Sequence, residues 1–277
     1  MRSSEPLEIA VMFWAGGDPA ETISELTRLG IRSGQLGLPG DLDLTCAPQW
    51  RDALRVADFR VYTVFAAYNG ESYADIPTVQ RTVGFVPPST RAERESRTLA
   101  ASDFAAVIGA TGIATHIGFV PESAEDPDYV AVREMVRRVC DHAARKHQTF
   151  ALETGQEPAA VLLRFIEDVD RPNLGINFDP ANMILYGTGD PIEALDILGP
   201  RVITVHCKDG DWPDPAQTGA LGQERALGSG SVGIARFLGK LKEIGYRGPL
   251  PIEREASDPV RRMNDIRAGI QLLSELR

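Results

Sequence analysis

Short apolar runs alternate with amphipathic segments along the chain. The clearest run, residues 7–14 (LEIAVMFW), is nearly continuous in apolar residues, which is typical of a strand buried on both faces of a parallel sheet. Gly16 and Gly17 break this run, and Asp18 and Pro19 then supply the cap and first-turn residues of a helix. Runs of the same kind predict eight strands, at residues 7–14, 33–38, 61–68, 113–121, 149–153, 174–179, 202–209 and 249–255.

Helical patterns fill the intervals between these strands. We expect helices at residues 18–30, 48–57, 91–109, 126–147, 158–169, 191–198, 234–244 and 259–276. Regular alternation of strands and helices predicts parallel pairing through right-handed crossovers and closure into a (β/α)8 barrel, the TIM barrel. A chain of 277 residues suits one such barrel, so we expect residues 1–277 to form a single domain.

Two connections lack a clear periodicity. Residues 69–90 follow a predicted strand, and a connection of this length is more often a functional loop than a packing device, so we expect it to overhang the active-site face. Residues 210–233 are rich in Gly, Pro and Asp. They contain GSGSVG at 228–233, which we interpret as a turn before a helix because it does not follow a strong strand or fit a dinucleotide fingerprint.

Composition narrows the classes of partner and compartment. The chain has 29 Lys and Arg against 39 Asp and Glu, a formal charge of −10, which argues against a nucleic-acid or anionic-membrane partner. Its three cysteines are widely separated and suggest neither a disulfide framework nor a CxxC metal site. The first residues lack the features of a signal peptide, and no apolar run is long enough to span a bilayer. We therefore expect a soluble, cytoplasmic protein.

Four predicted strands carry a metal-ligating side chain at the C-terminal end: Glu153, Asp179, His206 and Glu253. In a closed parallel barrel these ends meet on one face, so residues far apart in sequence converge there. One such Glu or His alone is usually a solvated loop residue or a hydrogen-bonded core residue. Four at equivalent places favour a site for a divalent cation, which would neutralise carboxylates that otherwise could not gather without a raised pKa. Glu255 lies on the same strand face as Glu253 and could be the ligand instead.

The segments around these residues resemble a known family. ALETG, NFDPAN, VHCKD and IERE resemble the metal-binding pattern of the sugar-phosphate isomerase/epimerase family of xylose-isomerase-like TIM barrels, and HIGFVP around His116 is also similar to it. The resemblance is dense from about residue 113 to 255. It implies that the four residues hold one divalent ion, Mn²⁺ first and Co²⁺, Mg²⁺ or Zn²⁺ as alternatives. That ion would chelate two neighbouring oxygens of a ketose or keto-sugar, with or without a phosphate.

The chemistry of such a substrate explains why a metal and two glutamates are needed. A proton on the carbon next to a carbonyl is too weakly acidic for a carboxylate to remove unaided, so the enediolate must be stabilised as it forms. A metal bridging carbonyl and hydroxyl oxygens does this as a Lewis acid. The resemblance implies that the two ligand glutamates also act as acid and base on opposite faces of the substrate, as in the epimerase members of the family. We therefore assign Glu153 and Glu253 as the proton-transfer pair, with Asp179 and His206 mainly as ligands.

Further residues at or beyond the same strand ends are expected to contact the substrate. Arg225, in the loop before LGSG, would donate to a carboxylate, a phosphate or a pair of hydroxyls, and Trp14 would form an apolar wall. Asn182 can hydrogen-bond a hydroxyl but cannot transfer protons like the His that some epimerases of this group place there. The full set of expected substrate contacts is His116, Asn182, Lys208, Asp209, Glu224, Arg225 and Trp14.

The functional prediction is a metal-dependent isomerase or epimerase of a small-molecule carbohydrate. A lyase that dehydrates a keto-inositol or keto-sugar on the same scaffold begins with the same proton abstraction and stays an alternative. A phosphodiesterase of the endonuclease IV type is less favoured, because it needs several more histidines than this chain's four, and a barrel that only binds a ligand is less favoured still. A homodimer or homotetramer is compatible with a helix-ringed barrel.

Overall fold

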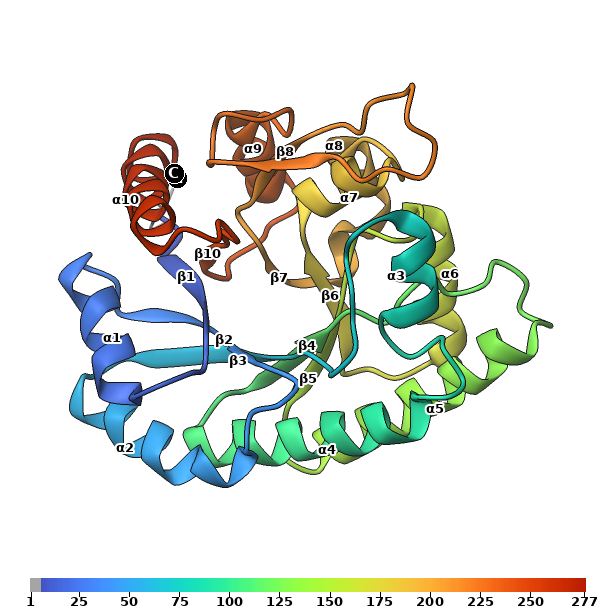
Figure 1. Ribbon diagram of the computed structural model, residues 1–277, viewed down its shortest axis with the longest axis horizontal. Coiled ribbons are helices and arrows are strands. Elements are labelled where there is room, and N and C mark those ends of the chain that lie inside the picture. The colour runs from blue at the N-terminus through green and yellow to red at the C-terminus, as the bar shows by residue number, and fades with distance from the viewer. Residues whose placement is uncertain (1–5) are drawn as a thin grey trace.

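The computed structural model describes residues 6–277, and its centre is an eight-stranded parallel sheet in the order β10-β1-β2-β3-β4-β5-β6-β7 (Figure 1). A parallel bridge between Cys207, just beyond β7, and Ile252 in β10 joins the two ends of this strand order, so the sheet closes into a barrel. The bounds are β1 (Ile9–Trp14), β2 (Ser33–Leu38), β3 (Arg60–Ala66), β4 (Gly112–Thr115), β5 (Thr149–Glu153), β6 (Leu174–Phe178), β7 (Val202–Val205) and β10 (Leu250–Ile252). The predicted (β/α)8 fold is confirmed.

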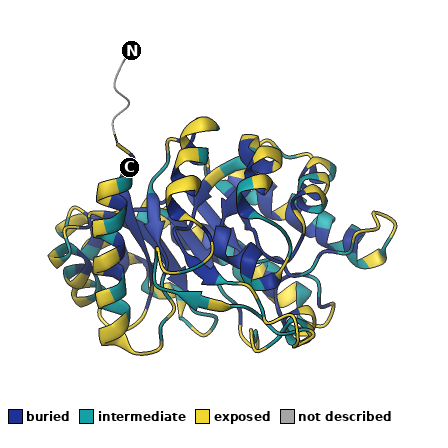
Figure 2. Ribbon diagram, turned by 90° about the horizontal axis from the view of Figure 1, so that it is seen from above, coloured by how far each residue is buried: buried dark blue, intermediate teal, exposed yellow. Residues whose placement is uncertain are grey.

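Amphipathic helices surround the strands. Their apolar residues are buried against the barrel. Figure 2 shows buried residues in dark blue on the inner side of the helices and exposed residues in yellow on the outer side. Aspartate caps begin several of them, for example Asp18 and Asp258, each of which accepts a hydrogen bond from a backbone N–H in the first turn. These helices are α1 (Pro19–Arg28), α2 (Ala47–Val56), α4 (Arg91–Ile108), α5 (Pro127–Ala144), α6 (Ala159–Val169), α8 (Pro191–Leu198), α9 (Ile234–Glu243) and α10 (Pro259–Leu276).

The inside of the barrel differs from its helix-covered outside. A separate apolar cluster of Met12, Phe65, Ala114 and Ala151 comes from alternate strands, which is the layered side-chain packing of TIM barrels. Polar side chains from β2, β6 and β7 are also buried inside, namely Gln35, Asn177 and Thr204. The barrel therefore carries a polar wall directly beneath the C-terminal ends of β6 and β7.

Several local elements differ from the sequence prediction. The connection 69–90 contains helix α3 (Ile76–Thr82), and helix α7 (Pro180–Tyr186) begins immediately after β6. The loop 210–233 overlaps a two-stranded antiparallel sheet of β8 (Asp209–Asp211) and β9 (Gln223–Arg225). The predicted fourth strand is also too long, because β4 ends at Thr115. These elements are too short to produce a clear period, and the two longer ones start at a proline or an aspartate cap that also suits a turn.

Within residues 6–277, no helix combines the length and the apolar character needed to cross a membrane. The first five residues, on which part of the signal-peptide expectation depends, lie outside the described part of the chain.

Candidate functional site

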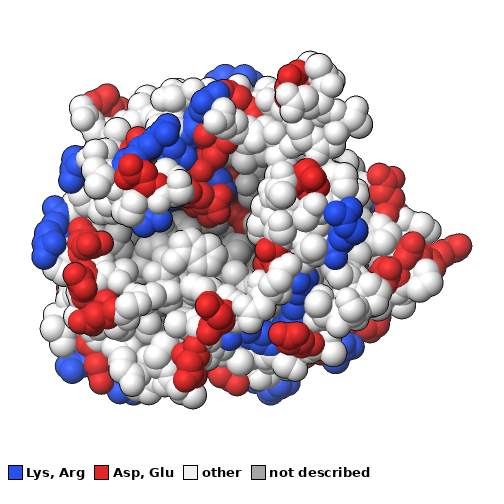
Figure 3. Space-filling model, in the orientation of Figure 1, with Lys and Arg blue, Asp and Glu red and all other residues white. Residues whose placement is uncertain are grey.

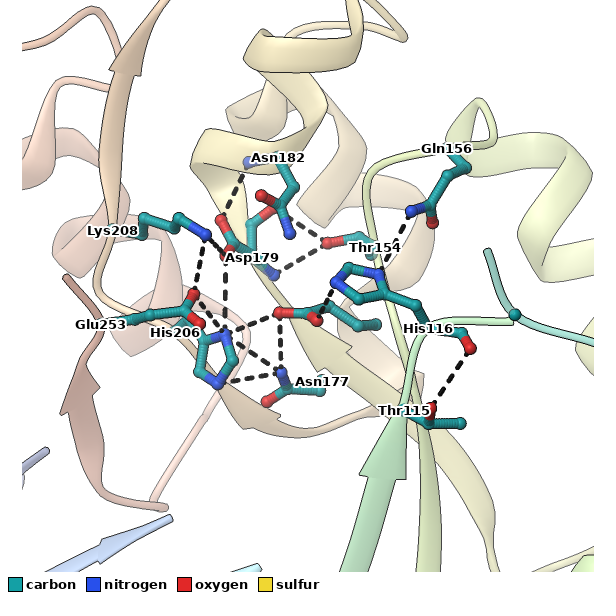
Figure 4. A network of polar contacts seen from close by, with 12 residues as sticks. Thr115, His116, Thr154, Gln156, Asn177, Asp179, Asn182, His206, Lys208 and Glu253 are labelled. Atoms are coloured by element: carbon teal, nitrogen blue, oxygen red, sulfur yellow. Dashed lines mark hydrogen bonds and ion pairs between the residues drawn. The ribbon is translucent and has the colours of Figure 1, made fainter. Parts of the chain in front are cut away.

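The four predicted ligands converge at the C-terminal end of the barrel. Glu153 is the last residue of β5, and Asp179, His206 and Glu253 each follow the last residue of β6, β7 and β10. One ligand atom from each lies within 4.8 Å of the others, and all four side chains are buried. Figure 4 shows Asp179, His206 and Glu253 pointing toward one another from neighbouring strand ends. Barrel closure brings these residues together across a hundred positions of sequence.

His206 lies at the centre of this cluster. Its Nδ1 is 2.7 Å from Glu153 Oε1, 3.1 Å from Glu253 Oε2 and 3.5 Å from Asp179 Oδ2. Burial disfavours the charged ring, but the Glu253 and Glu153 carboxylates outweigh this effect and raise the pKa of His206 well above its ordinary range. The ring therefore holds a proton on Nδ1, and a cation that binds at Nδ1 would take the place of that proton.

Gln35 fixes the orientation of the His206 ring from below. His206 Nε2 lies 2.9 Å from Gln35 Oε1, and the Gln35 amide donates to Thr204 Oγ1 at 2.8 Å and to Asn177 Oδ1 at 3.2 Å. Because the amide nitrogen is used in this way, Oε1 faces the ring as an acceptor, and Nε2 carries the hydrogen. Nδ1 is then the nitrogen that faces the carboxylates and that would bind a cation after losing its proton.

The inward-facing carboxylate oxygens of the cluster fit a divalent cation. Asp179 Oδ2 is buried without a hydrogen-bond partner among the described residues, and Glu253 Oε2 is buried with His206 Nδ1 at 3.1 Å and Lys208 Nζ at 3.0 Å. The other oxygen of Asp179 accepts from the backbone N–H of Asn182 at 2.9 Å and so caps α7. Burial raises the pKa of Asp179 to about 6, whereas the two imidazoles outweigh burial and lower the pKa of Glu153 to about 2. Three carboxylates and one imidazole are a suitable donor set for a divalent metal.

His116 holds the second oxygen of Glu153. Its Nε2 is 2.7 Å from Glu153 Oε2, and its Nδ1 is 3.2 Å from Gln156 Nε2. Burial opposes protonation of the ring, but the Glu153 carboxylate outweighs it and raises the pKa of His116 to about 9. The ring also packs edge-on against Phe65, with centroids 5.6 Å apart. His116 therefore orients Glu153 and faces the same cavity.

Lys208 forms the cationic side of the cluster and lies between Glu253 and Glu255, the two candidate metal ligands from this part of the chain. Its Nζ is 3.0 Å from Glu253 Oε2 and 3.1 Å from Glu255 Oε2, and its side chain is only 4% exposed. The Glu255 side chain is 52% exposed and lies outside the four-residue group. Glu253 is therefore the candidate ligand from β10, and Glu255 pairs with Lys208.

A cavity of about 280 Å³ opens above the cluster. Figure 3 shows a hollow in this face of the molecule, with acidic side chains along its edge. Of the expected substrate contacts, five line the cavity: Trp14, His116, Asn182, Lys208 and Glu224. Other lining residues include Phe65, Glu71, Tyr73, Tyr186, Leu221 and Glu255.

Two expected substrate contacts lie away from the cavity. The Asp209 carboxylate is buried and accepts hydrogen bonds from the backbone N–H groups of Gly210, Gly228, Gly230 and Val232, at 2.9 to 3.1 Å. Arg225 Nε is 2.6 Å from Asp211 Oδ2, on the hairpin of β8 and β9. Asp209 and Arg225 thus hold loops and do not line this cavity, and their contact with the substrate stays a prediction.

Sequence reasoning missed residues of two kinds. Gln35 lies in β2, a strand with weak apolar character. Only its position facing the inside of the barrel could have marked it as a residue of the site. Glu71 and Tyr73 come from the connection that was expected to overhang the site, but without a period no individual residue in it could be selected. Glu71 accepts from the backbone N–H groups of Tyr68 and Gly84 at 3.2 and 2.8 Å, so it ties the two ends of this connection together at the cavity.

Comparisons with known proteins agree with this geometry. The family described as xylose isomerase-like TIM barrel matches residues 25–276. The crystal structure of a xylose isomerase domain protein from Planctomyces limnophilus is 46% identical, with a TM-score of 0.93 and 98% of each chain covered. An L-ribulose 3-epimerase from Methylomonas sp. (strain DH-1) is 29% identical over 45% of this chain and 42% of its own length. A ketose 3-epimerase from Arthrobacter globiformis is also 29% identical, over 52% of this chain and 41% of its own length. The chain spans about half the length, or less, of the curated relatives it matches.

Proposed function

The chain belongs to the xylose isomerase-like TIM barrel family, and from this premise we propose that it is a divalent-metal-dependent isomerase or epimerase of a sugar, keto-sugar or sugar phosphate. The observation that carries the proposal is the convergence of Glu153, Asp179, His206 and Glu253, of which Glu153 and Glu253 line the cavity. The similarity to L-ribulose and ketose 3-epimerases supports the same class of reaction.

We assign the metal site to the same four residues, with Mn²⁺ as the first candidate. The bound cation would supply Lewis-acid polarisation of the substrate carbonyl. The buried Asp179 oxygen that has no hydrogen-bond partner among the described residues supports this assignment, as does the orientation of His206 by Gln35. We further propose a cytoplasmic enzyme and a homodimer or homotetramer.

Glu153 and Glu253 are the proposed proton-transfer residues. One removes the proton from the carbon next to the carbonyl, and the other returns a proton to the resulting enediolate. Both line the cavity, and each is held by a cationic group, His116 for Glu153 and Lys208 for Glu253. His116, Asn182 and Lys208 are in position to hydrogen-bond substrate hydroxyls. Phe65 and Trp14 supply the apolar wall that restricts access of water.

Dehydration of a keto-inositol or keto-sugar stays the alternative, because it begins with the same proton abstraction. His116 is the residue that favours it, since its ring lines the cavity beside Glu153 and could protonate a departing hydroxyl. Loss of water from the substrate separates the two reactions.

The decisive experiment measures exchange of the proton next to the carbonyl. Metal-stripped protein is incubated in deuterated water with a panel of keto-sugars, their phosphates and inososes, with and without Mn²⁺, and deuterium is followed by NMR. We expect Mn²⁺-dependent incorporation without net loss of water, reduced about a hundredfold or more in Glu153→Gln and Glu253→Gln because each lacks a general base. Glu125→Gln on an exposed loop is the matched control. Absence of exchange in the metal-loaded protein across the whole panel would contradict the proposal.

A further inference from the structure

The charged side chains around the cavity are already paired with one another. Lys208 is the only lysine or arginine among the described residues that line the cavity, and it is held between Glu253 and Glu255. Arg254 lies close by but binds Glu224 at 2.8 Å and Asp265 at 2.8 Å. Arg225, the residue best suited to an anion, pairs with Asp211. None of these three cations is left for a phosphate or carboxylate group of a ligand.

Backbone groups that could bind an anion are also filled by the chain's own carboxylates. The N-terminus of α7 points to the site, but Asp179 caps it by accepting the N–H of Asn182. The glycine-rich turn at residues 228–233 resembles a phosphate cradle in sequence, yet its N–H groups converge on Asp209. Both kinds of backbone anion site near the mouth therefore hold a side chain.

Acidic side chains outnumber basic ones on the cavity wall. Five glutamates line it, namely Glu71, Glu153, Glu224, Glu253 and Glu255. Because Glu153 and Glu253 belong to the proposed metal site, an incoming anion would meet chiefly the carboxylates of Glu71, Glu224 and Glu255, in a partly desolvated space where repulsion between like charges is strong. The cavity of about 280 Å³ lies at the small end of the range for ligand pockets, which suits a single sugar unit.

We propose that this site takes an uncharged polyhydroxy carbonyl compound and discriminates against phosphate esters and carboxylates, with Glu255 as a specificity-determining residue. Glu255 occupies the outer side of Lys208 and so removes the one cavity cation from use by an anionic substrate. The side chain is half exposed, so its replacement should not disturb the core. This inference narrows the substrate class of the proposed function and rests on it for the identity of the site.

The test measures anion binding directly and does not require turnover. Inorganic phosphate is titrated calorimetrically into Mn²⁺-loaded wild type, Glu255→Gln and Glu255→Gln/Lys208→Met, with Glu125→Gln as the exposed control. We expect no binding to wild type at millimolar phosphate. Glu255→Gln should bind about tenfold or more tightly than wild type, because Lys208 can then make a charge-assisted hydrogen bond to the anion. The added Lys208→Met change should abolish that gain.

Two results would overturn the inference. One is submillimolar phosphate binding by wild type, and the other is the absence of any gain in a folded Glu255→Gln protein. A paired assay of free keto-sugars against their phosphates separates this inference from the proposed function. Preferred exchange of the phosphate esters would overturn the substrate class while leaving the isomerase activity in place. If wild type binds no phosphate and exchanges no proton of any substrate, the proposed isomerase function is contradicted, whereas the exclusion of anions is not.

Discussion

Gln35 is a buried amide that lies beneath His206, a proposed metal ligand, and we expect it to affect metal affinity. Its carbonyl oxygen accepts the Nε2 hydrogen of His206, and its amide is held by Thr204 and Asn177. Loss of such an outer partner commonly lowers metal affinity 10- to 100-fold, because the ring no longer has a fixed tautomer and orientation. The effect should appear in binding and not only in activity.

We therefore expect Gln35→Leu to weaken Mn²⁺ binding by about 10- to 100-fold in a calorimetric titration of the stripped protein. Gln271→Leu on the exposed face of α10 is the control. Equal Mn²⁺ affinity in Gln35→Leu and wild type, with both folded, would show that Gln35 does not position the ligand.

Glu157 links stability to pH. It is fully buried, one oxygen accepts the N–H of Val120 at 2.9 Å, and burial raises the pKa of this carboxyl from its ordinary 4.5 to about 7. Between these values the folded protein keeps a proton that the unfolded chain has released. The resulting stabilisation is complete below pH 4.5 and is lost as the pH rises through 7, in total on the order of 3 kcal/mol.

Urea unfolding from pH 5 to 8 should show this contribution as a difference between variants. Glu157→Gln keeps the acceptor for Val120 and has no proton to lose, so its free energy of unfolding should rise relative to wild type with increasing pH. The exposed Glu125→Gln should follow wild type throughout. Parallel curves for Glu157→Gln and wild type would contradict the assignment.

At the scale of elements, Asp209 organises the loop that leads into α9. Its carboxylate gathers the N–H groups of four residues, among them Gly228 and Val232. Asp209→Ala leaves these buried donors without a partner. We expect the free energy of unfolding, or of local opening of this loop, to fall by about 2–4 kcal/mol. Faster hydrogen exchange of the backbone N–H groups at residues 228–232 would measure this loss.

Asp214→Ala, in the exposed loop between β8 and β9, is the matched control for this experiment. Unchanged protection of residues 228–232 in Asp209→Ala would mean that the turn holds itself without the carboxylate.

The barrel elements and the loop elements differ in how far the sequence predicts them. All of the eight strands except the weakly apolar β2 are local apolar runs, and their neighbours follow from alternation with helices, so strand order and the convergence of Glu153, Asp179, His206 and Glu253 could be predicted. Helix α3 and the β8–β9 hairpin depend instead on contacts between distant loops. The N–H of Ile76 at the start of α3, for example, donates to the carbonyl of Gly219 at 2.9 Å. No local period encodes such a contact, so Glu71 and Tyr73 could not be selected.

At the scale of the whole molecule, the metal site should add to stability. A cation that binds only the folded protein stabilises it by about 2.7 kcal/mol at a hundred times its Kd. We expect the midpoint of thermal unfolding to rise with Mn²⁺ and to fall when a chelator is added. Asp179→Asn should lose this response, whereas Asp41→Asn on the surface should keep it. A midpoint that does not depend on Mn²⁺ in wild type would argue against the site.

The joint between β7 and β10 closes the barrel, because these are the two end strands of the sheet order. A single bridge, Cys207 to Ile252, forms it, with the N–H of Glu253 donating to the carbonyl of Cys207 at 3.2 Å. His206 stands on one side of this seam and Glu253 on the other. An ion bound by both of these side chains would link the two strands across this joint, so the proposed metal site and the closure of the barrel would depend on the same ion.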